Sequence, residues 1–233
     1  MNTRGILTQL SYGELSNLAI GNDGDGTIRQ RDIGKVLNFI NDGLSELSGK
    51  FKLIDKYVSI QLFDHITHYH LNSRFSLSQQ PQPDVDFPYI LDSNREPFQN
   101  DVRKIHIVFD SNNKERPIND ETSMDSVFIQ GKESITVPNP VNGVFLFVHY
   151  RAEHFRVTLA NLDAELDLPN ALVPALKLYV ASRIYGSMST VDASNKSVEY
   201  LNHYLNICKD LVDEDISSDS KFKINHFDSR GWA

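Results

Sequence analysis

The spacing of the apolar residues changes twice along this chain of 233 residues, and this change limits the folds that it can adopt. Apolar residues recur at three- and four-residue steps in the first 50 residues and again in residues 169–213, which predicts amphipathic helices. Between residues 56 and 152 they alternate with polar residues, which predicts strands. The sequence therefore predicts an α+β fold, in which N- and C-terminal helical hairpins form a bundle with an inserted antiparallel β domain and an extended C-terminal tail.

This pattern divides the chain into four expected parts. An N-terminal helical hairpin is predicted in residues 1–50 and a β-rich domain in residues 51–165. A C-terminal helical hairpin that packs on the first is predicted in residues 166–213, and the tail covers residues 214–233.

The N-terminal hairpin consists of a helix within residues 3–19 and a second helix over about residues 28–48. Thr27 is the expected N-cap of the second helix, because Gln30 follows it at the capping-box spacing. A short connection between two helices is typical of an antiparallel pair.

The C-terminal hairpin begins near Pro169 or Pro174, since proline is tolerated in the first turn of a helix, and its first helix ends at Gly186. The final helix covers about residues 193–213. It carries an apolar seam at heptad-like steps, which is expected to face the core: Val198, Leu201, Leu205, Cys208 and Val212.

The middle of the chain is rich in Val, Ile and Phe, and turn residues separate its apolar runs. The run 66–71 is expected to pair back with the run 56–63, and residues 76–100, with four prolines, are interpreted as an extended loop. Further strands are predicted at residues 103–110, 125–131, 133–138 and 143–152.

Composition narrows the functional classes. The net charge of −8 makes the chain a poor candidate for gripping nucleic acid through its phosphates. No run of about eighteen apolar residues is present, and the first ten residues lack the apolar stretch of a signal peptide, so no membrane partner is expected. Cys208 is the only cysteine, which is typical of a reducing compartment.

Residues 21–32, GNDGDGTIRQRD, resemble a calcium loop. With Gly26 at the obligatory glycine position, Asp23, Asp25 and Asp32 take the third, fifth and twelfth places as candidate ligands. Gly21 takes the first place and offers no side-chain oxygen, so a turn that opens a helix is the favoured interpretation. A calcium-binding interaction module that uses this loop remains the alternative function.

No pattern in the sequence supports an enzyme. His65, His68 and His70 invite a metal site, but only His68 and His70 would share a strand face. The acidic segment 161–169 is interpreted as capping the helix that follows it. We therefore expect no catalytic residues, no resident metal and no cofactor.

The tail is polar, but from Phe222 onward it contains four isolated large apolar residues, one of which is the only tryptophan of the chain. Its low apolar density predicts that it has no structure of its own in the free protein. The four residues are Phe222, Ile224, Phe227 and Trp232.

The order of elements resembles the head–tail adaptors of short-tailed phages, the family of tail tubular protein A and related portal adaptors. The likeness covers roughly residues 5–213 and depends on three features. These are a strand, a turn with proline and a strand that ends in Tyr150-Arg151; an acidic segment that closes on Leu168-Pro169; and the helix ALKLYVASRIYG. The strand–turn–strand KIHIVFDSNNKERPI is also similar to a segment of that family.

The resemblance implies a structural virion protein. Such adaptors form a ring of twelve subunits below the portal protein, extend the DNA channel used in genome ejection, and provide the platform for the tail or nozzle protein. The genome would pass through the lumen without specific binding. The resemblance places Phe222, Ile224, Phe227 and Trp232 in clefts of the portal. The expected location is the virion neck, after assembly in the host cytoplasm.

Overall fold

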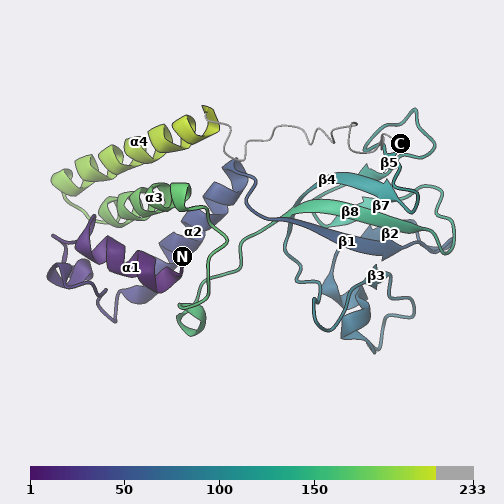
Figure 1. The fold of residues 1–233 in the computed structure, drawn as a ribbon, viewed down its shortest axis with the longest axis horizontal. Helices are drawn as coiled ribbons and strands as arrows, with labels where there is room; N and C mark the ends of the chain where they lie inside the picture. The colour runs from purple at the N-terminus through teal and green to yellow at the C-terminus, as the bar shows by residue number, and fades with distance from the viewer. Residues whose placement is uncertain (214–233) are drawn as a thin grey trace, which may run out of the picture. The chain divides into compact units, whose positions relative to one another are not determined.

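The computed structural model describes residues 1–213, and its fold is mixed α+β, with helices at both ends and antiparallel strands in the middle (Figure 1). This confirms the fold class predicted from the two changes in apolar spacing. The chain divides into two compact units. Unit 1 contains Met1–Leu53 together with the described residues from His154 onward, and unit 2 is Ile54–Glu153.

Unit 1 is helical. Its long helices are α1 (Thr3–Tyr12), α2 (Ile33–Lys50), α3 (Val173–Gly186) and α4 (Val191–Asp213). Short 3-10 helices lie between them: η1 (Ala19–Gly24), η4 (Leu159–Asn161) and η5 (Asn170–Leu172). The predicted start of α3 at a proline is confirmed, because Pro174 lies in its first turn, and so is its end at Gly186.

The first helix is shorter than predicted. Asn2 caps its beginning by accepting a hydrogen bond from the Gly5 N–H, and Gly13 ends it by donating to the Gln9 carbonyl. Residues 14–19 were expected to continue the helix, but Leu15 N–H bonds back to Leu10 O and the chain then turns into η1. The sequence already contains this interruption at Gly13, and the structure shows that the helix ends there.

The second helix begins at Ile33, five residues later than predicted. Thr27 is not its N-cap, because both the Thr27 N–H and its hydroxyl donate to the Asp25 carboxylate. The N-cap position is Asp32, which makes no side-chain capping bond. The predicted capping box is therefore wrong, and the hydroxyl stabilises the preceding turn instead of the helix.

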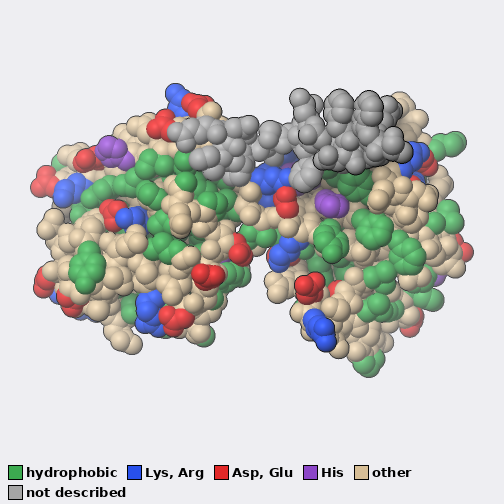
Figure 2. All heavy atoms as spheres, viewed as in Figure 1, with side chains coloured by type: hydrophobic (Ala, Val, Ile, Leu, Met, Phe, Trp, Pro, Cys, Tyr) green, Lys and Arg blue, Asp and Glu red, His purple; other side chains and the backbone are tan. Residues whose placement is uncertain are grey.

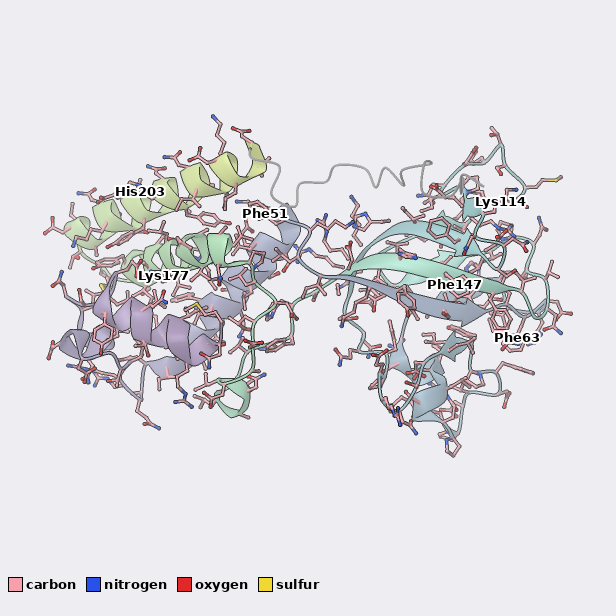
Figure 3. The ribbon with its side chains drawn as sticks, in the orientation of Figure 1. Phe51, Phe63, Lys114, Phe147, Lys177 and His203 are labelled. Atoms are coloured by element: carbon pink, nitrogen blue, oxygen red, sulfur yellow. The ribbon has the colours of Figure 1, made fainter. Side chains whose placement is uncertain are left out.

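Helices from both ends of the sequence share one core. Val36, Ile40, Leu44 and Leu47 of α2 are fully or almost fully buried in the same cluster as residues of α1, α3 and α4. The helix α3 is buried around most of its circumference, so it is the central element of this unit. The side chain of Phe51, directly after α2, is also fully buried here (Figure 3).

The beginning of the chain is tied to the segment that follows the β unit. Arg4 makes a bidentate ion pair with Asp163, with distances of 2.6 and 2.8 Å, and its backbone N–H donates to Leu162 O. The acidic segment 161–169 was expected to cap a helix, but neither η5 nor α3 has a side-chain cap. Asp163 neutralises Arg4 instead, which joins two regions far apart in the sequence.

Unit 2 contains two antiparallel sheets. The five-stranded sheet has the order β3-β1-β8-β4-β5, and the three-stranded sheet has the order β2-β7-β6. The strands are β1 (Asp55–Gln61), β2 (His68–His70), β3 (Ile90–Leu91), β4 (Val102–Asp110), β5 (Glu115–Arg116), β6 (Phe128–Ile129), β7 (Ser134–Thr136) and β8 (Phe145–Ala152).

Two expectations for the strands are wrong. The strand β2 was expected to pair with β1, but it pairs with β7, which follows it by more than sixty residues along the chain. The segment 76–100 was expected to be only a loop, but it contains β3 at the edge of the sheet beside β1 and the 3-10 helix η3 (Leu77–Gln79). A second short helix, η2 (Ser73–Phe75), precedes it.

The two sheets enclose one core, and the five-stranded sheet keeps a second face. Val58 and Val148 from one sheet and Tyr69 and Ile135 from the other belong to the same buried cluster. The opposite face of the five-stranded sheet carries aromatic side chains, among them Phe147 (Figure 3), and is partly exposed to solvent. The residues of this aromatic face are Tyr57, Ile107, Phe109, Phe147 and His149.

Candidate functional site

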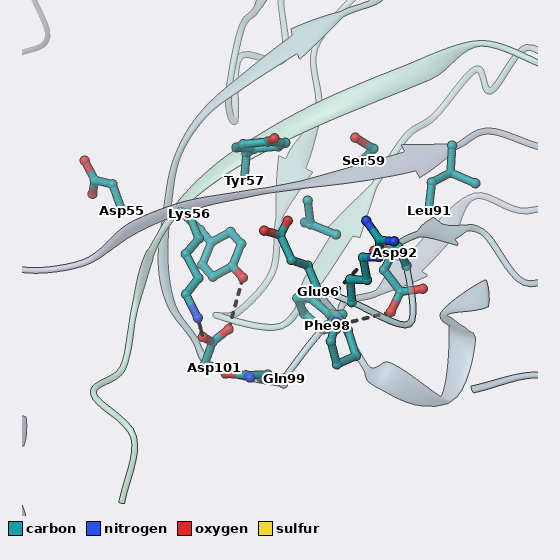
Figure 4. Close-up of a pocket in the computed structure, with 15 residues that line it drawn as sticks. Asp55, Lys56, Tyr57, Ser59, Leu91, Asp92, Glu96, Phe98, Gln99 and Asp101 are labelled. Carbon is teal, nitrogen blue, oxygen red and sulfur yellow. Dashed lines mark hydrogen bonds and ion pairs between the residues drawn. The ribbon is translucent and has the colours of Figure 1, made fainter. Parts of the chain in front are cut away.

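A polar hollow of unit 2 lies beside the edge of the five-stranded sheet. It has a volume of about 720 Å³ and is lined by β1, by β3 with the segment that follows it, and by Tyr150 of β8 (Figure 4). Six charged side chains line it: Asp55, Lys56, Asp92, Arg95, Glu96 and Asp101.

Lys56, Asp101 and Tyr150 form a linked group at one end of the hollow. Lys56 Nζ lies 2.6 Å from one carboxylate oxygen of Asp101, and the Tyr150 hydroxyl donates to the other at 3.0 Å (Figure 4). Burial, reinforced by the adjacent carboxylate, raises the pKa of Tyr150. Tyr150 therefore stays protonated at physiological pH, and its hydroxyl acts as a hydrogen-bond donor.

Asp92 organises the other end of the hollow. Burial opposes its ionisation, but hydrogen bonds from the Ser78 hydroxyl, the Phe98 N–H and the Ser78 N–H outweigh burial, and the pKa of Asp92 is lowered. An ionised Asp92 thereby holds the segment 92–98 against the turn at Ser78.

The two carboxylates Asp92 and Asp101 of this hollow bond to groups of the chain itself. Both oxygens of Asp101 and both oxygens of Asp92 already accept hydrogen bonds from the chain. Asp101 fastens the end of the segment 92–101 to β1 and β8, whereas Asp92 fastens its beginning to the turn at Ser78. Sequence reasoning did not find this group, because Asp101 lies 45 residues from Lys56 and 49 from Tyr150, without a local motif to connect them.

The glycine-rich loop, residues 21–32, forms a turn in which the Asp25 carboxylate accepts hydrogen bonds from neighbouring residues. Hydrogen bonds from the Thr27 hydroxyl and N–H, and from Asn22, lower the pKa of Asp25. Asn22 and Asp23 adopt left-handed backbone angles, with φ of 50° and 59°. The third candidate, Asp32, lies 3.5 Å from Arg31 Nε.

The structure does not gather the candidate calcium ligands. Within residues 1–213, no group of three or more His, Cys, Asp or Glu side chains is placed to hold a metal ion. His65, His68 and His70 form no such group either in the described part of the chain. His68 and His70 are exposed on either side of the buried Tyr69, whereas His65 lies before β2 and contacts Asp64 at 3.1 Å.

The final helix presents a different face from the one expected. The predicted seam was to be buried, but only Cys208 is, and the other four residues are 39–55% exposed. The face in the core consists of Ala193, Tyr204, Cys208 and Leu211. Tyr204 contacts Tyr179 of α3 edge to face, and Lys50 of α2 lies over the Tyr204 ring. The predicted seam is therefore a surface (Figure 2).

The candidate portal-docking residues, Phe222, Ile224, Phe227 and Trp232, lie outside the described residues. No helix in the described part of the chain is both long and apolar enough to cross a bilayer. Neither a protein-family model nor a curated protein matches this sequence.

Proposed function

We propose that this chain is a head–tail adaptor of a short-tailed phage, a structural virion protein that forms a ring of twelve copies below the portal. The observation that supports this most is the sharing of one core by helices from both ends, with the β unit between them in the sequence. This is the element order on which the resemblance depends. In this proposal, the helices form two hairpins packed as a bundle, and the β domain is an insertion.

Adhesion between copies is the first requirement of a ring. A head-to-tail ring needs two different complementary faces on each copy. The aromatic face of the five-stranded sheet supplies an apolar surface of the kind that interfaces use, since aromatic residues are enriched there. Tyr57 of β1, 69% exposed, and His149 of β8 are neighbours on this face, with ring centroids 6.1 Å apart.

The lumen of such a ring must let DNA slide. Each copy carries a net charge of −8, so twelve copies give a strongly negative assembly, which does not bind phosphates tightly. In the polar hollow beside Asp101, the Lys56 and Asp101 side chains are engaged with each other, and Asp92 is engaged with Ser78 and the Phe98 N–H, which fits a building block better than a catalyst.

The C-terminal segment provides the contact with the portal in this proposal. Phe222, Ile224, Phe227 and Trp232 would enter clefts between portal subunits, and their burial would compensate for the entropy lost on ordering the segment. Removing this segment is therefore expected to uncouple docking on the portal from folding of the two units.

Assembly on portal rings tests this proposal. Purified full-length chain and a chain that ends at Asp213 are mixed separately with rings of the cognate portal protein and imaged by electron microscopy. We expect the full-length chain to add a second ring of density with twelve copies per portal, measured by mass photometry, and the shortened chain to add none. If the full-length chain adds no ring, the adaptor proposal is wrong. If both chains add equal rings, only the role of the tail is wrong.

A further inference from the structure

The helix α4 has a second apolar face that the core of unit 1 does not use. Val191, Val198, Leu205 and Val212 repeat at intervals of seven residues, so they follow one another along a single stripe. Leu201 lies between them. The exposed fractions are 77% for Val191, 55% for Val198, 39% for Leu201, 46% for Leu205 and 43% for Val212. We call these five residues the α4 stripe (Figure 2).

An acidic row accompanies the α4 stripe. Asp192, Glu199 and Asp213 each follow a stripe valine by one position, so they lie along the same edge of it. Lys209 also borders the stripe, and its aliphatic stem extends the apolar surface. A partner for this surface needs an apolar face and, beside it, cationic groups.

The chain continues directly from this surface. The stripe runs from residue 191 to 212, a length of about 32 Å at the rise of an α-helix. Twenty residues follow Asp213, and an extended segment of that number can span up to about 66 Å. Residues 214–233 are therefore long enough to reverse direction and run back along the whole stripe.

Within that segment, residues 221–224 match the chemistry of the surface. In Lys221-Phe222-Lys223-Ile224, apolar and basic residues alternate. An extended backbone places Phe222 and Ile224 on one side and the two lysines on the other. The apolar side then fits the stripe, and the flexible lysine side chains reach the acidic row beside it.

We propose that, in the unassembled protein, residues 214–233 bind the α4 stripe of the same chain, with Phe222 and Ile224 on the stripe and Lys221 and Lys223 toward the acidic row. This contact does not depend on the adaptor proposal. If both hold, portal and stripe compete for the same aromatic residues, so docking on the portal uncovers α4 for another contact. The segment would then keep the protein from associating too early.

Disulfide trapping in the full-length chain tests the contact. With Cys208→Ala as background, Ser220→Cys is combined with Leu205→Cys on the stripe or with His203→Cys as the matched control. Leu205 and His203 are both exposed on α4 and only two positions apart in the sequence, and this spacing places them on different sides of the helix. Circular dichroism verifies that each variant keeps its helices.

We expect the intramolecular disulfide to form about tenfold faster with Leu205→Cys than with His203→Cys, because binding raises the local concentration of the tail thiol. Adding Phe222→Ala and Ile224→Ala should remove this difference. Equal rates for the two pairs would overturn the proposal. Disulfides that join two chains, detected by mass spectrometry of mixed isotope-labelled samples, would overturn it in favour of a second copy on the stripe.

Discussion

Replacing Gly43 by alanine tests the contact between α2 and α3, which joins the N- and C-terminal parts of unit 1. A Cβ atom at this position would lie 2.6 Å from Leu176 Cδ1 and 3.0 Å from Tyr179 Cδ1. Leu176 is fully buried, so it has no free space into which to move. We predict that Gly43→Ala lowers the free energy of unfolding, although alanine is the better helix former.

Two opposing effects set the magnitude. Alanine in place of glycine in a helix stabilises by about 1 kcal/mol. An added methyl group in a filled core costs about 1–3 kcal/mol, because neighbouring side chains leave their preferred rotamers. The net result is a loss of about 0–2 kcal/mol for Gly43→Ala.

Gly34 on the same helix is the matched control, because a Cβ atom there meets no atom within 4 Å. Gly34→Ala should be neutral or stabilising by up to about 1 kcal/mol, so the two variants should differ by roughly 1–3 kcal/mol. Urea denaturation followed by circular dichroism at the helix band measures both. If Gly43→Ala is as stable as Gly34→Ala, α2 and α3 do not approach each other as described.

Three further predictions concern single side chains. Asp101→Asn should lower the free energy of unfolding of unit 2 by about 1–3 kcal/mol, because Lys56 and the buried Tyr150 hydroxyl lose their anionic acceptor. Urea denaturation followed by tyrosine absorbance measures this loss. An unchanged free energy of unfolding would show that the linked group of Lys56, Asp101 and Tyr150 is dispensable. Asp25 has a lowered pKa, so its stabilising effect is complete above the ordinary carboxyl pKa of about 3.9 and is lost as the pH falls through the lower folded-state value. The melting temperatures of wild type and Asp25→Asn should thus converge from pH 6 to pH 3, and a calcium-induced rise in the wild type alone would instead support the calcium module. The Cys208 thiol is buried, and burial raises its pKa. A thiol reagent should therefore modify Cys208 slowly in the native protein and quickly in denaturant. Fast modification of the native protein would contradict the packing of α4.

Local patterns predicted the elements of this fold better than their partners. The helical period of α4 was predicted correctly, but two stripes share that period, and the aliphatic Val and Leu residues suggested the wrong one as the buried face. Tyr204 and Ala193 face the core because they fit against α3, and such shape matching depends on a second helix far away in the sequence. The predicted partner of β2 was wrong for the same reason, because its actual partner β7 is distant from it along the chain.

The turn at Asp25 and the group around Asp101 differ in how well the local sequence predicts them. The turn at Asp25 follows a local rule, because an Asp side chain often accepts a hydrogen bond from the backbone N–H two residues later. This rule predicts the bond from Thr27 to Asp25 that the structure contains. The group around Asp101 follows no such rule. It depends on the register of β1 with β8, which pairs Lys56 with Tyr150, and sequence spacing does not encode that register.

The core that helices from both ends of the sequence share has a consequence for synthesis on the ribosome. Unit 2 is one continuous stretch of sequence, so it can fold as soon as Glu153 has emerged. The first helices must wait, because their partners in α3 and α4 are translated last, several seconds later at about 5–20 residues per second. During this interval the folded β unit shortens the effective loop between α2 and α3, which lowers the entropic cost of bringing them together.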